Sequence, residues 1–167
     1  MLHYFDRPHE GPAREPLADR SAWRGSRVRT ESDWLHELRP DDVAELEAAL
    51  AHAVSSGKPI GDLTASDFPL PRLAATIRDW RTEVNRGRGL LVVRGVPVQR
   101  WSRDDAERFF WCIGLHMGRP GTQNVHGDLL GHVTDTGDDA SDPFVRLYRT
   151  ASDIAYHCDA ADVVGLL

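Results

Sequence analysis

The chain has 167 residues, of which 41% are hydrophobic and 28% are charged, and its formal net charge is −6 with histidines neutral. This composition is ordinary for a globular protein with one hydrophobic core, and it excludes a fibrous or low-complexity chain. The acidic balance, with arginines spread along the sequence, argues against a nucleic-acid partner, which would require a basic face.

Cysteine usage and the N-terminus bear on the cellular compartment. Cys112 and Cys158 form no CxxC pair, so reduced thiols are favoured over a disulfide framework. The first residues show no basic region followed by an apolar run, and no stretch approaches the roughly 18 apolar residues of a membrane span. We therefore expect a cytoplasmic protein with no membrane partner.

The first elements along the chain are an irregular arm and a helix. Residues 1–30 are rich in Pro, Arg and Glu, and we expect an arm that is ordered only where something packs on it. Residues 31–167 are assigned to one domain. A helix is predicted over 41–56, with Gly57 as its stop and with apolar residues at helical spacing: Val43, Leu46, Leu50, Ala53 and Val54.

Two further helices flank a predicted strand. A helix over 71–86 has an apolar stripe, and the run at 90–93 is short, β-branched and bounded by glycines, which predicts a buried strand. A third helix begins at Ser102, which forms a capping-box pattern with Asp105, and it ends at Gly118. The stripe of the second helix consists of Leu73, Ile77, Trp80 and Val84.

After Gly118 turn residues become frequent, and only short apolar runs remain. Candidate strands lie at 132–134, 145–148, 154–157 and 163–167. Short strands with frequent turns are typical of a sandwich or barrel. The predicted fold class is therefore α+β, with helices first and the opening strands of a β-sandwich after them.

The candidate chemistry lies in Tyr156-His157-Cys158-Asp159. Residues i and i+2 of a strand point to the same face, so His157 and Asp159 would project together and Cys158 would point away. One imidazole and one carboxylate supply two legs of the 2-His-1-carboxylate triad that binds non-haem Fe(II). On spacing alone, a chance HxD tripeptide is the more frequent explanation.

The surroundings of this motif carry a resemblance. The run VRLYRTASDIAYHCDAADVVGLL over 145–167 resembles the segment around the first two iron ligands of taurine dioxygenase-like (TauD/TfdA) enzymes. Upstream pieces follow in the same order: DFPLP at 67–71, GRGL at 87–90, VRGVP at 93–97, LHMGRP at 115–120, QN at 123–124 and GDLLGHV at 127–133. The resemblance covers roughly residues 59–167.

This resemblance implies a fold, a reaction and cofactors. The fold is a double-stranded β-helix (jelly-roll) preceded by helices, of which this chain would hold a part. His157 and Asp159 would be iron ligands, and Fe(II) with 2-oxoglutarate as co-substrate would support hydroxylation of a small-molecule substrate. The family's second histidine ligand and its 2-oxoglutarate-binding arginine lie far downstream of HxD. The sequence ends eight residues after Asp159, so we expect an incomplete active site.

Other polar residues have functional and ordinary interpretations. Gln123, Asn124 and Asp153 are candidates for substrate binding, although hydrogen bonds within a loop explain the first two more simply. Arg149 could steer an anionic group, but a surface ion pair is the simpler role. Capping, surface or packing roles are expected for the histidines that might otherwise complete an iron site: His116, His126 and His132.

Two alternatives to a dioxygenase remain. The first is a non-catalytic, truncated remnant that acts, if at all, as an interaction module. The second is a cupin-type metal site, although cupins carry a motif richer in histidine. Strands without neighbours would expose apolar residues, so we also expect homo-oligomers or aggregation.

Overall fold

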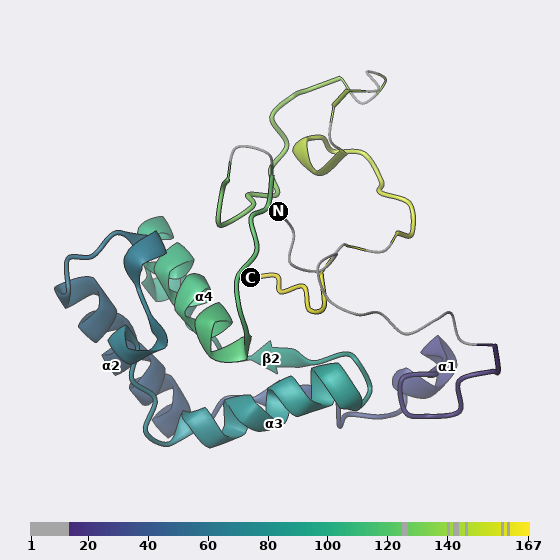
Figure 1. Ribbon diagram of the computed structural model, residues 1–167, viewed down its shortest axis with the longest axis horizontal. Helices are drawn as coiled ribbons and strands as arrows, with labels where there is room; N and C mark the ends of the chain where they lie inside the picture. Colours follow the sequence, from purple (N-terminus) through teal and green to yellow (C-terminus); the bar gives the residue numbers. More distant parts are fainter. Residues whose placement is uncertain are drawn as a thin grey trace.

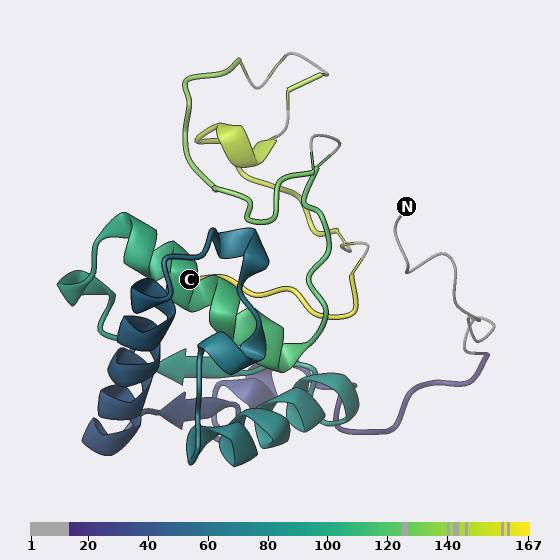
Figure 2. The ribbon, with the colours of Figure 1, turned by 60° about the vertical axis from the view of Figure 1, so that its left-hand side comes forward.

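The computed structural model describes residues 14–124, 127–139, 141, 144–145, 147–157, 159 and 161–167. Three long helices, α2, α3 and α4, form a body with a small parallel sheet (Figures 1 and 2). Residues 119–167, here called the C-terminal segment, extend from this body, and those of them that the structure describes form no strand. Within the described part of the chain, no helix is both long and apolar enough to cross a membrane.

Helix α2 (Pro40–Ser55) confirms the first predicted helix to within one residue. Pro40 occupies the first turn, where its missing N–H is not needed, and the Asp42 carboxylate accepts a hydrogen bond from the Arg39 N–H at 3.0 Å. The chain leaves the helix through Gly57 at a φ of +66°. The apolar pattern was wrong at Val54, which is exposed because it lies at the edge of the stripe. The buried face consists of Leu46, Ala49, Leu50 and Ala53.

Helix α3 (Leu73–Arg86) confirms the second prediction, starting two residues later than expected. Leu73, Ile77 and Trp80 are buried, whereas Val84 is half-buried near the helix end. Helix α4 (Arg103–Met117) starts as predicted, because the Ser102 hydroxyl accepts from the Asp105 N–H at 3.1 Å.

The core lies where α4 packs against both α2 and α3. Short 3₁₀ turns link the long elements: η2 (Ile60–Asp62), η3 (Ala65–Asp67) and η4 (Val98–Arg100). Phe68, which follows η3, is fully buried at this junction, and its ring centroid lies 6.1 Å from that of Phe109 on α4. Cys112 is also fully buried, and burial raises the pKa of its thiol to about 11.

The sheet consists of two parallel strands, β1 (Leu35–Glu37) and β2 (Val92–Arg94), with Leu35 opposite Val92. The predicted strand at 90–93 is therefore present but shifted by two residues. It was wrong in burial, because Val92 and Arg94 are exposed at the margin of a sheet with only two strands. Strand β1 was not predicted from the sequence.

The strands predicted after Gly118 were wrong for the residues that the structure describes at 132–134, 145–148, 154–157 and 163–167. These stretches lack strand pairing, and residues 147–149 form a 3₁₀ turn, η5 (Leu147–Arg149). A strand needs a hydrogen-bonded neighbour, and no described segment supplies one here. The observed helices and the two-stranded sheet agree with the predicted mixture of helix and strand. The partial jelly-roll stays a prediction.

Candidate metal centre

His157 and Asp159 lie on an extended, irregular stretch of the C-terminal segment. The His157 Nε2 and an Asp159 carboxylate oxygen are 3.6 Å apart, and more than half of each side chain is exposed. The two side chains therefore lie close together, but the strand whose alternation was expected to bring them together is absent from the described residues. Cys158, predicted to point away from the pair, lies outside the described residues.

A backbone contact orients the imidazole of His157. Its Nδ1 lies 2.9 Å from the carbonyl oxygen of Ala155. A carbonyl oxygen can only accept, so Nδ1 carries a proton in this contact, and Nε2 is the ring nitrogen that faces the Asp159 carboxylate. Metal-binding histidines use the same arrangement, in which the non-coordinating ring nitrogen donates to a backbone carbonyl.

The pair fits one metal ion without large movement. Ligands about 2.1 Å from an ion and at right angles to each other are separated by about 3.0 Å, so a small rotation of either side chain closes the present 3.6 Å. Among the described residues, no group of three or more His, Cys, Asp or Glu side chains has a geometry that could hold a metal ion.

The other candidate histidines have structural contacts. His116 lies with Nε2 2.9 Å from the Phe68 carbonyl oxygen, inside the helical body. The His132 Nε2 is 2.9 Å from a carboxylate oxygen of Glu107 on α4. Both positions agree with the packing and surface roles predicted for them, and His126 lies outside the described residues.

The substrate candidates Gln123 and Asn124 lie in a closed loop. The Gln123 N–H donates to the Asp128 carbonyl oxygen at 2.7 Å, and the Asn124 side-chain amide donates to the Asp128 carboxylate at 2.6 Å. These bonds favour the ordinary interpretation of the two residues. Asp153 is exposed four residues before His157, and Arg149 forms an ion pair with Asp138 at 2.9 Å.

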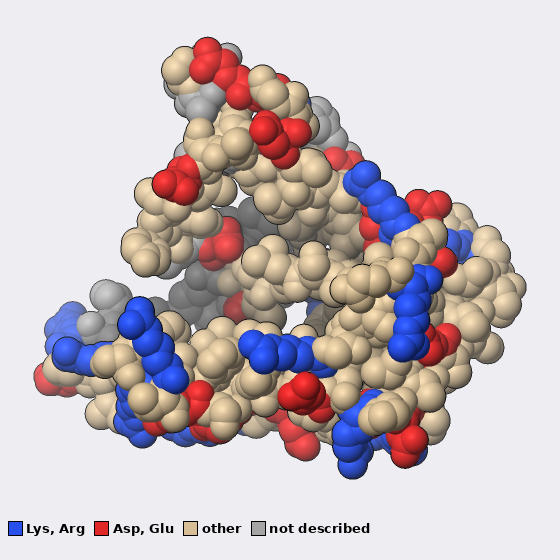
Figure 3. Space-filling view, turned by 180° about the vertical axis from the view of Figure 1, so that it is seen from behind, with Lys and Arg blue, Asp and Glu red and all other residues tan. Residues whose placement is uncertain are grey.

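The net negative charge of the chain lies around the His157 and Asp159 motif. Residues 128–162 contain eight aspartates and two arginines, a formal charge of −6, while the rest of the chain contains 18 acidic and 18 basic residues. The whole net charge therefore resides in this acidic stretch. In Figure 3 the blue basic side chains follow the helical body, whereas the projecting part shows acidic side chains. Such a field attracts cations toward the motif.

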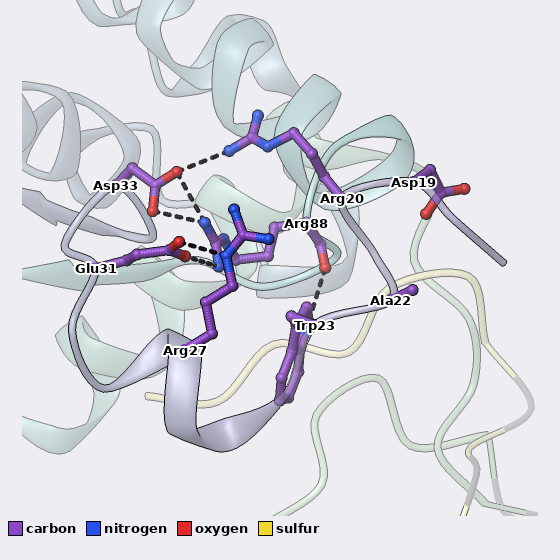
Figure 4. A pocket seen from close by; sticks show the side chains of 8 residues that line it. All are labelled: Asp19, Arg20, Ala22, Trp23, Arg27, Glu31, Asp33 and Arg88. Carbon is purple, nitrogen blue, oxygen red and sulfur yellow. Dashed lines mark hydrogen bonds and ion pairs between the residues drawn. The ribbon is translucent and has the colours of Figure 1, made fainter.

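A second polar site, which the sequence did not reveal, lies where the N-terminal segment (residues 14–34) meets α3. A hollow of about 240 Å³ is lined by Trp23, three arginines and three acids (Figure 4). The Arg88 guanidinium, almost fully buried, bonds both Asp33 oxygens at 2.8 and 2.9 Å and approaches Glu31 at 2.6 Å. The hollow is lined by Asp19, Arg20, Ala22, Trp23, Arg27, Glu31, Asp33 and Arg88.

The charges of this ionic cluster neutralise one another. Hydrogen bonds from Arg88, opposed by partial burial, hold the pKa of Asp33 below its usual value, and the Arg27 and Arg88 contacts do the same for the pKa of Glu31. Trp23 adds a hydrogen bond from its indole to the Arg88 carbonyl oxygen at 3.1 Å. The cluster therefore holds the N-terminal segment to the body, and neither His157 nor Asp159 lines the hollow.

Most of the chain is similar in sequence to known proteins. A family model described as "Taurine catabolism dioxygenase TauD, TfdA family" matches residues 56–167. FR-33289 synthase of Streptomyces rubellomurinus is 28% identical over 155 residues, which is 92% of this chain and 46% of that protein. The taurine hydroxylase-like protein SAT17 of Stachybotrys chartarum is 27% identical over 157 residues, which is 90% of this chain and 41% of that protein. The chain thus spans less than half the length of these curated relatives.

Proposed function

Because the chain belongs to the TauD/TfdA family, we propose that it contributes the His-x-Asp half of an Fe(II)- and 2-oxoglutarate-dependent dioxygenase site. His157 and Asp159 would hold the metal, and Fe(II) with 2-oxoglutarate would supply the oxidising chemistry for hydroxylation of a small-molecule substrate. The observation that carries this proposal is the position of the His157 Nε2, which lies 3.6 Å from the Asp159 carboxylate while Nδ1 contacts the Ala155 carbonyl oxygen.

Three features of this chain's own residues support the metal role. The Ala155 carbonyl oxygen engages Nδ1, so Nε2 is the nitrogen that faces Asp159 and is available to a metal ion. The exposure of both side chains leaves room for further ligands and for a co-substrate. The negative charge of residues 128–162 raises the local concentration of divalent cations. The site lies, on this proposal, in the domain assigned to residues 31–167 of a cytoplasmic protein.

The test is an anaerobic titration of the chain with Fe(II), or with Mn(II) as a redox-stable substitute. We expect weak binding that falls on the order of tenfold or more in His157→Ala and in Asp159→Ala, because ligand number sets affinity. Matched controls are His52→Ala and Asp79→Ala, which remove an exposed histidine and an exposed aspartate from α2 and α3. Equal binding by all five proteins would exclude the assignment.

A second candidate function is that of a non-catalytic interaction module. The exposed apolar side chains of the C-terminal segment favour it, since Tyr156, Phe144 and Leu166 are almost wholly exposed. The two candidates differ in their dependence on metal. If the wild-type chain bound no metal ion, and its association with another protein were unchanged in His157→Ala, these results would favour the interaction module.

A further inference from the structure

The C-terminal segment returns to α4 at two points that flank the candidate metal pair. Before the motif, the His132 Nε2 lies 2.9 Å from a Glu107 carboxylate oxygen. After the motif, Gly165 lies so close to Phe110 that a Cβ built on it would be 3.2 Å from Cζ of the ring. In Figure 2 the C-terminus lies beside the green helix α4, in agreement with this contact.

The two anchor residues on α4 are neighbours in space. Glu107 and Phe110 are three positions apart in a helix, so their side chains lie on one face about one turn apart. The chain between His132 and Gly165 therefore contacts the same face of α4 near both of its ends. His157 and Asp159 lie within this loop, which lacks regular strands among its described residues.

We propose that this face of α4 positions the candidate metal ligands, with Glu107 and Phe110 as positioning residues. The proposal rests on the metal role proposed above. A loop that is not held by strands must lose conformational freedom when its residues bind one ion, and contacts that close its ends reduce that loss. Ligands held in advance therefore bind more tightly than the same ligands on a free loop.

The chemistry of each anchor fits this role. Hydrogen bonds from Arg103 and His132, opposed by partial burial, keep the pKa of Glu107 below its usual value, so the carboxylate stays ionised as an acceptor. Gly165 allows the backbone to approach the edge of the Phe110 ring more closely than a residue with a Cβ would. One anchor is thus polar and the other steric, and they can be removed separately.

The experiment compares Mn(II) affinity and hydrogen exchange in variants of the full chain. Glu107→Leu removes the polar anchor, Glu107→Gln keeps an acceptor, and Gly165→Val adds a side chain whose Cβ alone would crowd the Phe110 ring. Glu47→Leu is the matched control, because Glu47 forms a comparable ion pair with Arg100 on the surface of α2. Arg103→Gln removes the other partner of Glu107 and leaves the His132 contact in place.

We expect Glu107→Leu and Gly165→Val to weaken Mn(II) binding about fivefold or more, with partial recovery in Glu107→Gln and wild-type affinity in both controls. In metal-free protein, deuterium uptake over 132–165 should rise in the same two variants, while uptake in α2 and α3 stays unchanged. This pattern would separate positioning from a general loss of stability.

Three results would contradict the proposal in distinguishable ways. Unchanged exchange over 132–165 in Glu107→Leu and Gly165→Val would show that α4 does not hold the loop. Unchanged Mn(II) affinity in these variants, with binding abolished in His157→Ala, would leave the metal role standing and exclude positioning by α4. Binding independent of both His157 and Asp159 would exclude the metal role itself, and the positioning role with it.

Discussion

At the scale of single residues, Asp67 shows how one carboxylate makes stability depend on pH. Its oxygens accept hydrogen bonds from the Lys58 ammonium at 2.7 Å and from the Thr64 N–H and hydroxyl. These contacts, with Lys58 contributing most, lower the pKa of Asp67 from 3.8 to about 2. The charged form is therefore the form that stabilises the turn at η3.

The sign of the pH effect follows from this lowered pKa. The stabilisation by Asp67 is complete above its unfolded pKa of 3.8 and is lost as the pH falls through about 2. We expect Asp67→Asn to lower the urea midpoint of unfolding at about pH 5, and the difference from wild type to shrink toward about pH 2. A difference that stays constant over this range would contradict the ion pair as its cause.

The sequence pattern identified His157 and Asp159 as candidate metal ligands, but it did not predict the contacts around them. The convergence of His157 and Asp159 depends on a spacing of two, which is visible in the sequence. The contact between His157 and the Ala155 carbonyl depends on local backbone geometry and could not be predicted. The sequence also gave no sign of the Arg88 cluster, because its ion pairs join residues 55 and 57 positions apart, Asp33 and Glu31 with Arg88.

At the scale of elements, Phe68 holds the helices together although it belongs to none of them. Its ring is fully buried against Phe109, and its carbonyl oxygen lies 2.9 Å from the His116 Nε2. We expect Phe68→Ala to lower the free energy of unfolding by about 3–5 kcal/mol, because a large buried side chain is lost and a cavity remains. Chemical denaturation followed by tryptophan fluorescence measures this change, and a loss below about 1 kcal/mol would show that the core closes around the cavity.

The attachment of the N-terminal segment to α3 and β2 depends on Arg88. We expect Arg88→Met to increase trypsin cleavage within residues 14–34 several-fold, because Asp33 loses its main cationic partner and Glu31 loses one of two. Arg86→Met is the control, since Arg86 is exposed near the same end of α3. If both variants are cleaved at the wild-type rate, the Arg88 ion pairs are not what holds the segment.

Elements with their own periodicity were predicted, and elements that depend on partners were not. Helices α2, α3 and α4 have apolar stripes and caps, so their bounds were recovered within about two residues. Strand β1 is only three residues long and exists because β2 pairs with it. The strands predicted beyond Gly118 are absent from the described residues for the same reason, because short apolar runs between turns do not provide a neighbouring strand.

At the scale of the whole molecule, the exposed apolar side chains of the C-terminal segment bear on self-association. A folded protein seldom leaves so many large apolar side chains in water. We expect concentration-dependent oligomers or aggregates in size-exclusion chromatography with light scattering, together with binding of a hydrophobic dye. A monodisperse monomer with one cooperative unfolding transition would contradict this expectation. The exposed side chains include Phe144, Ile154, Tyr156, Val164, Leu166 and Leu167.

The uneven distribution of charge gives the molecule a dipole moment. Residues 128–162 carry a formal charge of −6 and the remainder carries none, so the molecule has a dipole that points from the acidic stretch toward the helical body. On a positively charged support it would be adsorbed in one preferred orientation, with the segment that contains His157 and Asp159 against the surface. Divalent cations that neutralise this stretch would weaken both the dipole and the orientation, without any change in the body.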